Sequence, residues 1–225
     1  MKVLVSDYDK TLDVNIDENI KSINTFREEG NIFVIATGRS LLDINKKINE
    51  YNINYDYLLI NHGATIIDKN NNILSNIIIN DVNKIINDLD LESSVRYFCT
   101  SGLESRVDFD HSNITKINIK YETECYAEKV NQLLNEKYDN INSYHISPYS
   151  IEIISSDIDK SKAINILKDI LKITKEDIYT VGDGPSDYKM IKEFNGYSMN
   201  ESIDELKKIS KSVSSVSELI NLIKK

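Results

Sequence analysis

The chain has 225 residues, of which 40% are hydrophobic, and it carries a formal net charge of −9. This length can bury one ordinary core and a smaller module. The negative charge and the lack of a basic stripe exclude a nucleic-acid footprint, and no apolar run approaches the roughly 18 residues of a membrane-spanning helix. We therefore expect a cytoplasmic monomer or homodimer whose partner is a small molecule, with no nucleic acid and no membrane.

Apolar strands alternate with amphipathic helices in the first part of the chain. The pattern predicts strands at 2–6, 32–36 and 57–60, and helices near 17–29 and 40–51. Strands that alternate with helices in this way form a parallel sheet. Gly30 stands where the first helix must stop, and its tolerance of left-handed dihedrals suits a helix end.

The pattern changes after the turn at 70–72. Strands are predicted at 95–100, 106–109, 114–121, 141–146 and 150–154, with a short helix ending at 91 and a longer one near 124–138. Adjacent strands without helices between them favour antiparallel pairing. From residue 160 the alternation of helix and strand returns. We therefore expect an α/β fold, with a Rossmann-like, doubly wound parallel core formed by 1–79 and 157–225 and an inserted α+β cap at 80–156.

Two aspartates follow the first predicted strand. Asp7 and Asp9 come after the apolar run at 3–5, where a buried strand ends and open α/β sheets place their ligands. Their side chains point the same way if the chain stays extended. Hydrolysis of a phosphate ester needs a nucleophile and a proton donor for the leaving oxygen. Asp7 would attack phosphorus to form an aspartyl-phosphate, and Asp9 would protonate the leaving alcohol and later deprotonate water.

The acidic residues require a cation. Two carboxylates about 4 Å apart repel by roughly 4 kcal/mol at an effective dielectric constant near 20, and Asp183 and Asp187 add to that repulsion. Mg²⁺ prefers oxygen ligands and leaves coordination positions for water and a phosphate oxygen. The sequence therefore predicts a Mg²⁺ site formed by Asp7, Asp9, Asp183 and Asp187.

Further polar residues are placed to bind a phosphoryl group. Thr37 follows the second strand and can donate its hydroxyl, Gly38 lets the backbone approach, and Lys162 supplies a positive charge from the first turn of its helix. Ser186 follows Pro185, which suits a first helical position. For Arg39, contact with the substrate and a salt bridge to an acid of the site are equally favoured.

These segments, in this order, resemble the haloacid dehalogenase-like phosphatases, and in particular their Cof-type or IIB subgroup with a C2-type cap. The resemblance spans nearly the whole chain. It implies that Asp7 is the nucleophile, Asp9 the acid/base, Thr37 and Lys162 phosphate ligands, and Asp183 and Asp187 Mg²⁺ ligands. Thr11 occupies the family's threonine position, and Asn200, in a segment similar to the family's Met-x-Asn, lines the site.

Three positions depart from the family pattern. Ser186 replaces the usual Asn before the last acid and reaches less far, although it can still donate a hydrogen bond. His62 stands where the subgroup commonly has Asn, and Lys10 replaces a common Gly. None of these changes removes a predicted metal ligand.

The expected function is Mg²⁺-dependent hydrolysis of small phosphate monoesters, such as sugar phosphates, phosphoglycolate or phosphorylated cofactors, with the cap closing over the substrate. One alternative is a phosphomutase that returns the phosphoryl group to a sugar. Another is a phosphate-ligand binding or regulatory protein without turnover, although binding alone would not need an acid/base such as Asp9.

Overall fold

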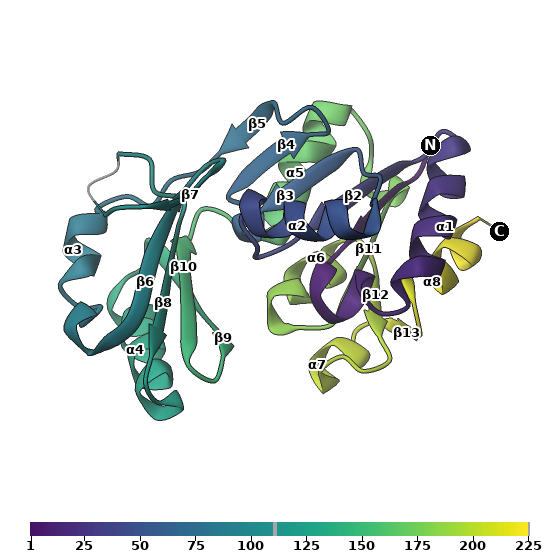
Figure 1. Cartoon of the computed structure of the whole chain (residues 1–225). Coiled ribbons are helices and arrows are strands. Elements are labelled where there is room, and N and C mark those ends of the chain that lie inside the picture. Colours follow the sequence, from purple (N-terminus) through teal and green to yellow (C-terminus); the bar gives the residue numbers. More distant parts are fainter. Residues whose placement is uncertain (110–111, 225) are drawn as a thin grey trace.

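The chain folds around two β-sheets. The computed structural model describes residues 1–109 and 112–224. An eight-stranded sheet has the order β13-β12-β11-β1-β2-β3-β4-β5, and a five-stranded sheet has the order β7-β6-β8-β10-β9. We call the first sheet with its helices the core and the second sheet with its helices the cap; they lie side by side as two lobes (Figure 1).

The core sheet is parallel except at one edge. Its parallel strands are β1 (Val3–Ser6), β2 (Ile32–Ala36), β3 (Tyr57–Ile60), β11 (Ile178–Gly182), β12 (Asn195–Met199) and β13 (Lys211–Val213). The central strand β1 pairs with β2 and β11, and all four of its residues are buried. A parallel strand buried on both sides needs helices on both faces of the sheet.

The core helices form one layer on each face of this sheet. They are α1 (Ile16–Glu28), α2 (Leu41–Tyr51), α5 (Lys160–Leu171), α6 (Tyr188–Glu193), α7 (Asp204–Lys207) and α8 (Val216–Ile223). Leu4 belongs to one apolar cluster with residues of α1, α2 and α8, whereas Val5 belongs to a second cluster with residues of α5, α6 and α7. Because neighbouring strand residues point to opposite faces, the sheet is doubly wound, as predicted.

The cap is an antiparallel sheet with helices on one face. Its elements are α3 (Val82–Ile86), β6 (Ser94–Ser101), β7 (Glu104–Val107), β8 (Lys116–Tyr121), α4 (Glu124–Lys137), β9 (Ile141–Ser147) and β10 (Ser150–Ser155). Every strand pair is antiparallel. Ile117, Ile119, Ile151 and Ile153 pack with Leu134 of α4 in a third apolar cluster. Antiparallel pairing in this region was predicted from the absence of helices between the strands.

A hairpin between β3 and the cap was not predicted. Strands β4 (Thr65–Asp68) and β5 (Ile73–Asn76) extend the core sheet in antiparallel fashion, so the core is not wholly parallel. The Asn-rich segment 70–72 is the turn that joins them. The exact boundaries of the insert remain a prediction. In the part of the chain that the structure describes, every helix is too short or too polar to cross a membrane.

Candidate active site

Several of the predicted site residues lie at the carboxyl ends of the central core strands. Asp7 follows β1, and its backbone N–H donates to the carbonyl of Val181 in β11 at 2.9 Å. Thr37 follows β2, and Asp183 follows β11. Parallel strands end at one edge of the sheet, so residues distant in sequence come together there.

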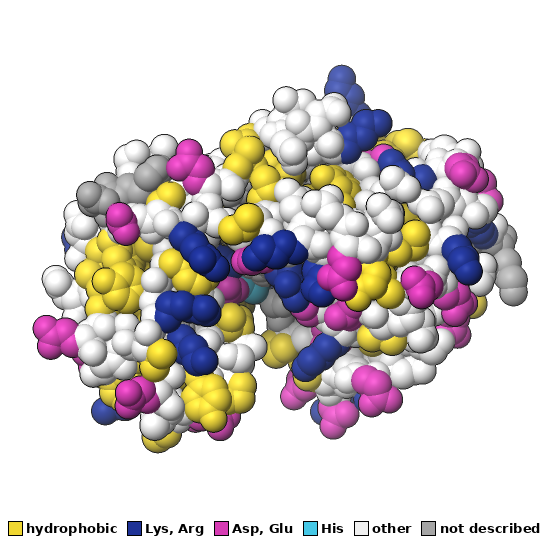
Figure 2. All heavy atoms as spheres, in the orientation of Figure 1, with side chains coloured by type: hydrophobic (Ala, Val, Ile, Leu, Met, Phe, Trp, Pro, Cys, Tyr) yellow, Lys and Arg dark blue, Asp and Glu magenta, His cyan; other side chains and the backbone are white. Residues whose placement is uncertain are grey.

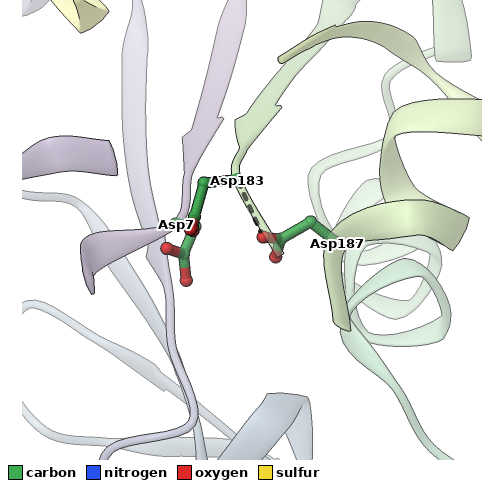
Figure 3. A group of neighbouring side chains, drawn as sticks. All are labelled: Asp7, Asp183 and Asp187. Carbon is green, nitrogen blue, oxygen red and sulfur yellow. Dashed lines mark hydrogen bonds between the residues drawn. The ribbon is translucent and has the colours of Figure 1, made fainter. Parts of the chain in front are cut away.

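Three carboxylates form a compact cluster at this edge. Asp7, Asp183 and Asp187 each present an oxygen, and these oxygens lie within 4.8 Å of one another (Figure 3). Asp187 ends a short 3₁₀ turn, 185–187, and its Oδ2 accepts hydrogen bonds from the N–H groups of Asp183 (3.1 Å) and Gly184 (3.0 Å). A Cβ at Gly182 would lie 2.4 Å from Cγ of Asp187. Glycine at position 182 therefore allows the Asp187 carboxylate to pack against the end of β11.

Lys160, not Lys162, supplies the positive charge at this cluster. Its Nζ lies 2.5 Å from Oδ1 of Asp7 and 2.6 Å from Oδ1 of Asp187, and its side chain is 2% exposed. The Nζ of Lys162 instead donates to the carbonyl of Ser156 at 2.8 Å, in an exposed position. The choice of Lys162 as the phosphate ligand is corrected by this placement, because its ammonium group is not directed to the aspartates.

The start of helix α5 explains this difference. Asp159 is the N-cap residue and accepts from the N–H of Lys162 at 2.9 Å, so the helix begins at Lys160. Lys160 then lies on the same side of the helix as the buried residues Ala163, Ile164 and Leu167. This N-cap signal and the apolar spacing were present in the sequence and could have identified Lys160.

Burial and mutual repulsion shape the charges of the cluster. Burial raises the pKa of Asp7 to about 8, against the opposing effect of Lys160 and with a further contribution from Asp187. Burial, with the charge of Asp187, raises the pKa of Asp183 to about 6. Burial lowers the pKa of Lys160, but the carboxylates of Asp187 and Asp7 outweigh it and raise that pKa above its ordinary value. Lys160 therefore stays charged between the two aspartates.

The cluster has the composition of a divalent-cation site. Three carboxylates and one ammonium group leave two uncompensated negative charges when all are ionised. The ligand atoms that it offers are oxygens, which Mg²⁺ prefers. Burial raises the pKa values of Asp7 and Asp183, and repulsion from neighbouring aspartates adds to this effect, which a bound cation would oppose. The residues present therefore fit a Mg²⁺ ion.

Asp9 lies apart from this cluster. The chain turns at residues 8–12, and within this turn Asp9 has extended dihedrals (φ −72°, ψ 127°) whereas Lys10 adopts a left-handed conformation (φ 57°). The Asp9 carboxylate is 51% exposed and accepts from Nε (2.9 Å) and Nη2 (2.6 Å) of Arg39. The predicted role of the Asp9 carboxylate as a metal ligand is thus corrected in this conformation. Of the two roles considered for Arg39, the structure contains the salt bridge.

The remaining predicted residues lie at the same edge of the sheet. Thr37 is fully buried, and its Oγ1 accepts from the N–H of Arg39 at 3.1 Å. Thr11 donates to Oδ1 of Asp183 at 3.5 Å, which connects it with the carboxylate cluster. Ser186 is half-buried in the turn before Asp187, and Asn200 is exposed directly after β12. These placements leave both residues candidates for contact with a ligand.

A cluster of buried polar side chains connects the core to the cap. His62, in the short turn 61–63 of the core, has its Nε2 2.6 Å from Oε2 of Glu152 in β10. Lys116 of β8 donates to Oε1 of Glu152 at 2.6 Å and to the carbonyl of Gly38 at 2.5 Å. Asn118 donates to the same Oε1 at 3.1 Å. Cap residues therefore reach the loop that carries Thr37.

Burial and the neighbouring charges together decide the protonation states of Glu152 and His62. Burial raises the pKa of Glu152, but the ammonium of Lys116 and the hydrogen bond from His62 outweigh it and hold that pKa at about 2. Burial lowers the pKa of His62. The imidazole is thus neutral and donates through Nε2, while its Nδ1 is buried without a hydrogen-bond partner among the described residues.

The contact between His62 and Glu152 was not predicted from the sequence, in which His62 is only a departure from the family pattern. Polar residues at positions 116, 118 and 152 alternate with buried isoleucines along β8 and β10. That period of two indicates a second, polar face of the cap sheet. It does not reveal which core residue the face meets.

Comparison with known proteins agrees with this fold. A model of the haloacid dehalogenase-like hydrolase family matches residues 4–108 and 100–218. The chain therefore belongs to the haloacid dehalogenase-like hydrolases. Its carboxylate cluster contains Asp7, Asp183 and Asp187, and Lys160 rather than Lys162 contacts this cluster.

Individual relatives are distant but cover nearly the whole chain. The chain is 25% identical over 217 residues to the 5-amino-6-(5-phospho-D-ribitylamino)uracil phosphatase of Bacillus subtilis, with 92% of this chain and 87% of the relative covered. A haloacid dehalogenase-like hydrolase from Bacteroides thetaiotaomicron has a similar structure, with a TM-score of 0.83, 21% identity and 99% of both chains covered. The subclass IIB sugar phosphatase BT4131 has a TM-score of 0.80, with 15% identity and coverage of 100% of this chain and 98% of its own.

Proposed function

We propose that this protein hydrolyses small phosphate monoesters in a Mg²⁺-dependent reaction through an aspartyl-phosphate on Asp7. The observation that carries the proposal is the position of Lys160 between Asp7 and Asp187, beside Asp183. A buried carboxylate held by a lysine and placed next to two further acids suits attack on a phosphoryl group, because a cation bound there neutralises the incoming phosphate.

The roles of the residues follow from their atoms. Asp7 attacks phosphorus, and the bond from phosphorus to the ester oxygen breaks. An ammonium group has three donors, and two of those on Lys160 are directed to Asp7 and Asp187. The third donor is available for a phosphoryl oxygen, together with the Thr37 hydroxyl. Asp7, Asp183 and Asp187 would hold a Mg²⁺ ion, which would supply charge neutralisation for the phosphoryl group.

Asp9 is the proposed acid and base. It protonates the leaving alcohol oxygen, and then removes a proton from the water that hydrolyses the aspartyl-phosphate. Its carboxylate is paired with Arg39 in this conformation, so it must leave that pair to act on the substrate. The exposure of Asp9 permits such a rotation, and Arg39 then remains close to the reacting groups.

The substrates that we propose are phosphorylated metabolites in the cytoplasm. The Bacillus subtilis relative is named for a phosphorylated ribitylamino compound, and BT4131 is described as a sugar phosphatase. Both names support a polyhydroxylated or heterocyclic leaving group, with the cap as the element that selects it. Monomeric and homodimeric forms are both compatible with this proposal.

The test is phosphate release from a panel of phosphate monoesters, with and without Mg²⁺. Asp7→Asn keeps the shape of the side chain but removes the nucleophile, and is expected to lower kcat by at least about a thousandfold. Circular dichroism of this variant should match that of the unchanged protein. Full activity of Asp7→Asn, or equal activity in Mg²⁺ and in a chelator, would contradict the proposed mechanism.

A further inference from the structure

The polar face of the cap sheet is directed to the core. Along β8, Ile117 and Ile119 pack under the cap helices, so Lys116, Asn118 and Lys120 lie on the opposite face. Lys116 and Glu152 on this face contact Gly38 and His62 of the core. The ring of Tyr144, in the neighbouring strand β9, stacks on His62 with 5.0 Å between the ring centroids. This face therefore covers the loop that follows β2.

Two cations lie directly opposite each other on this face. Arg96 of β6 pairs in register with Lys120 of β8, and Phe98 pairs with Asn118. Like charges directly opposite in an antiparallel sheet are destabilising. Such a pair is conspicuous in a chain with a net charge of −9, because the composition offers many acidic residues that could have stood opposite either cation.

The ion pairs found within the described ranges 1–109 and 112–224 include neither Arg96 nor Lys120. Each is held beside an aromatic ring instead. The guanidinium carbon of Arg96 is 5.6 Å from the ring centroid of Phe98, and the Nζ of Lys120 is 6.0 Å from that of Tyr149. Arg96 is exposed and Lys120 is half-buried. Both charges thus remain accessible to an anion.

Basic side chains are visible on this part of the cap. Dark-blue side chains gather on the cap lobe along the side that faces the core, next to the hollow between the two lobes (Figure 2). Lys120 lies four residues beyond Lys116, or about 13 Å along the strand, and Lys116 itself contacts the carbonyl of Gly38 next to Thr37. Because Arg and Lys side chains are long, their charged groups can lie closer to the site than this backbone distance, so a ligand has less distance to cover.

We propose that Arg96 and Lys120 form a second anion subsite, and that the substrate carries a carboxylate or a second phosphate at the end remote from the scissile phosphate. This inference rests on the proposed function, because it places the scissile phosphate at Asp7 and Lys160. The fork of Arg96 suits a planar carboxylate or a phosphate in two-point contact. Lys120 adds a point charge on the neighbouring strand.

The experiment measures binding by calorimetry to the full-length Asp7→Asn variant in Mg²⁺, so that ligands are not consumed. Three ligands share a sugar skeleton: glucose 6-phosphate, 6-phosphogluconate with an added carboxylate, and glucose 1,6-bisphosphate with an added phosphate. We expect at least one doubly anionic ligand to bind about tenfold tighter or more than glucose 6-phosphate. A difference in affinity between 6-phosphogluconate and glucose 1,6-bisphosphate shows whether the subsite prefers a carboxylate or a phosphate.

Arg96→Gln and Lys120→Gln, each made in the Asp7→Asn background, should each remove about tenfold of that preference and leave the affinity for glucose 6-phosphate unchanged. Lys129→Gln is the matched control, because Lys129 is an exposed cation on helix α4 of the same cap. An equal loss in Lys129→Gln would show a general charge effect and overturn the subsite. Equal affinity for all three ligands, or no binding of any, would overturn it as well.

The two proposals can fail separately. Phosphate release from glucose 6-phosphate by the unchanged protein, without any preference for a second anion, would leave the phosphatase proposal standing and remove the subsite. Selective binding of doubly anionic ligands by a protein that hydrolyses no ester would keep the subsite and remove the phosphatase proposal.

Discussion

Nε2 of His62 in the core lies 2.6 Å from Oε2 of Glu152 in the cap, and both side chains are more than 90% buried. Glu152 also accepts from Lys116, so this one carboxylate holds a core imidazole and a cap ammonium together. The contact between the cap and the core thus depends on the buried, hydrogen-bonded carboxylate of Glu152.

Glu152→Gln should destabilise the protein by about 3–5 kcal/mol, because it leaves the ammonium of Lys116 buried without its counter-charge. Urea unfolding measures this change. Glu128→Gln, at an exposed position of helix α4, is the matched control and should change the free energy of unfolding by less than about 0.5 kcal/mol. Equal stability of the two variants would show that the buried pair contributes nothing.

The contribution of Glu152 should depend on pH in one direction. Its pKa falls from 4.5 to about 2 on folding. A lowered pKa of an acid stabilises the fold above the unfolded value, and this stabilisation, about 3 kcal/mol, is lost as the pH falls from about 4.5 towards 2. The lowered pKa of His62 likewise makes the fold less stable as the pH falls below about 6.5. The raised pKa of Asp7 has the opposite effect and makes the fold more stable as the pH falls. The quantity to measure is therefore the difference in the free energy of unfolding between the unchanged protein and Glu152→Gln.

That difference in the free energy of unfolding should be constant between pH 5 and pH 6 and shrink below about pH 4.5. A difference that stays constant down to pH 3 would argue against ionised Glu152 in the native state.

Lys160→Gln should lower kcat by about a hundredfold or more, because it removes the only ammonium in hydrogen-bond contact with Asp7 among the described residues. Lys162→Gln, two residues further along the same helix, should retain kcat within about twofold. Phosphate release assays of the two variants compare the lysine that the structure favours with the one that the sequence interpretation chose. The opposite ranking would return the role to Lys162.

Gly38→Ala should lower stability by about 1–3 kcal/mol, because a Cβ at residue 38 would lie 2.6 Å from Cε1 of His62. The imidazole cannot move freely, since it is held by Glu152 and stacked on Tyr144. The double variant with His62→Ala should cost less than the sum of the two single variants. Thermal unfolding of all four proteins measures this coupling, and simple additivity would show that the two residues do not collide.

Asp183→Asn should weaken Mg²⁺ binding by about tenfold or more, because it removes one of the three charges that the cluster offers to a cation. Calorimetric titration with MgCl₂ alone gives the affinity without a substrate. Asp169→Asn is the control, since the Asp169 side chain is 76% exposed on helix α5. An unchanged affinity in Asp183→Asn would place the metal elsewhere.

The sequence by itself determined the class of fold and the acidic residues of the site. Alternation of apolar strands with helices predicts a parallel core, and adjacent strands without helices predict the antiparallel cap; both follow from short-range periodicity. Asp7, Asp183 and Asp187 were found because each lies within a few residues of the end of a strand, and the ends of parallel strands meet at one edge.

The tertiary structure alone decided how the surrounding side chains are directed. A two-residue difference in the start of helix α5 selects Lys160 over Lys162, since rotation around a helix sends the second side chain to another face. The carboxylate of Asp9 pairs with Arg39 and lies outside the cluster that Asp7 forms with Asp183 and Asp187. His62 and Glu152 are 90 residues apart in the chain. No local pattern predicts such a contact, because it depends on how the cap sheet is seated on the core.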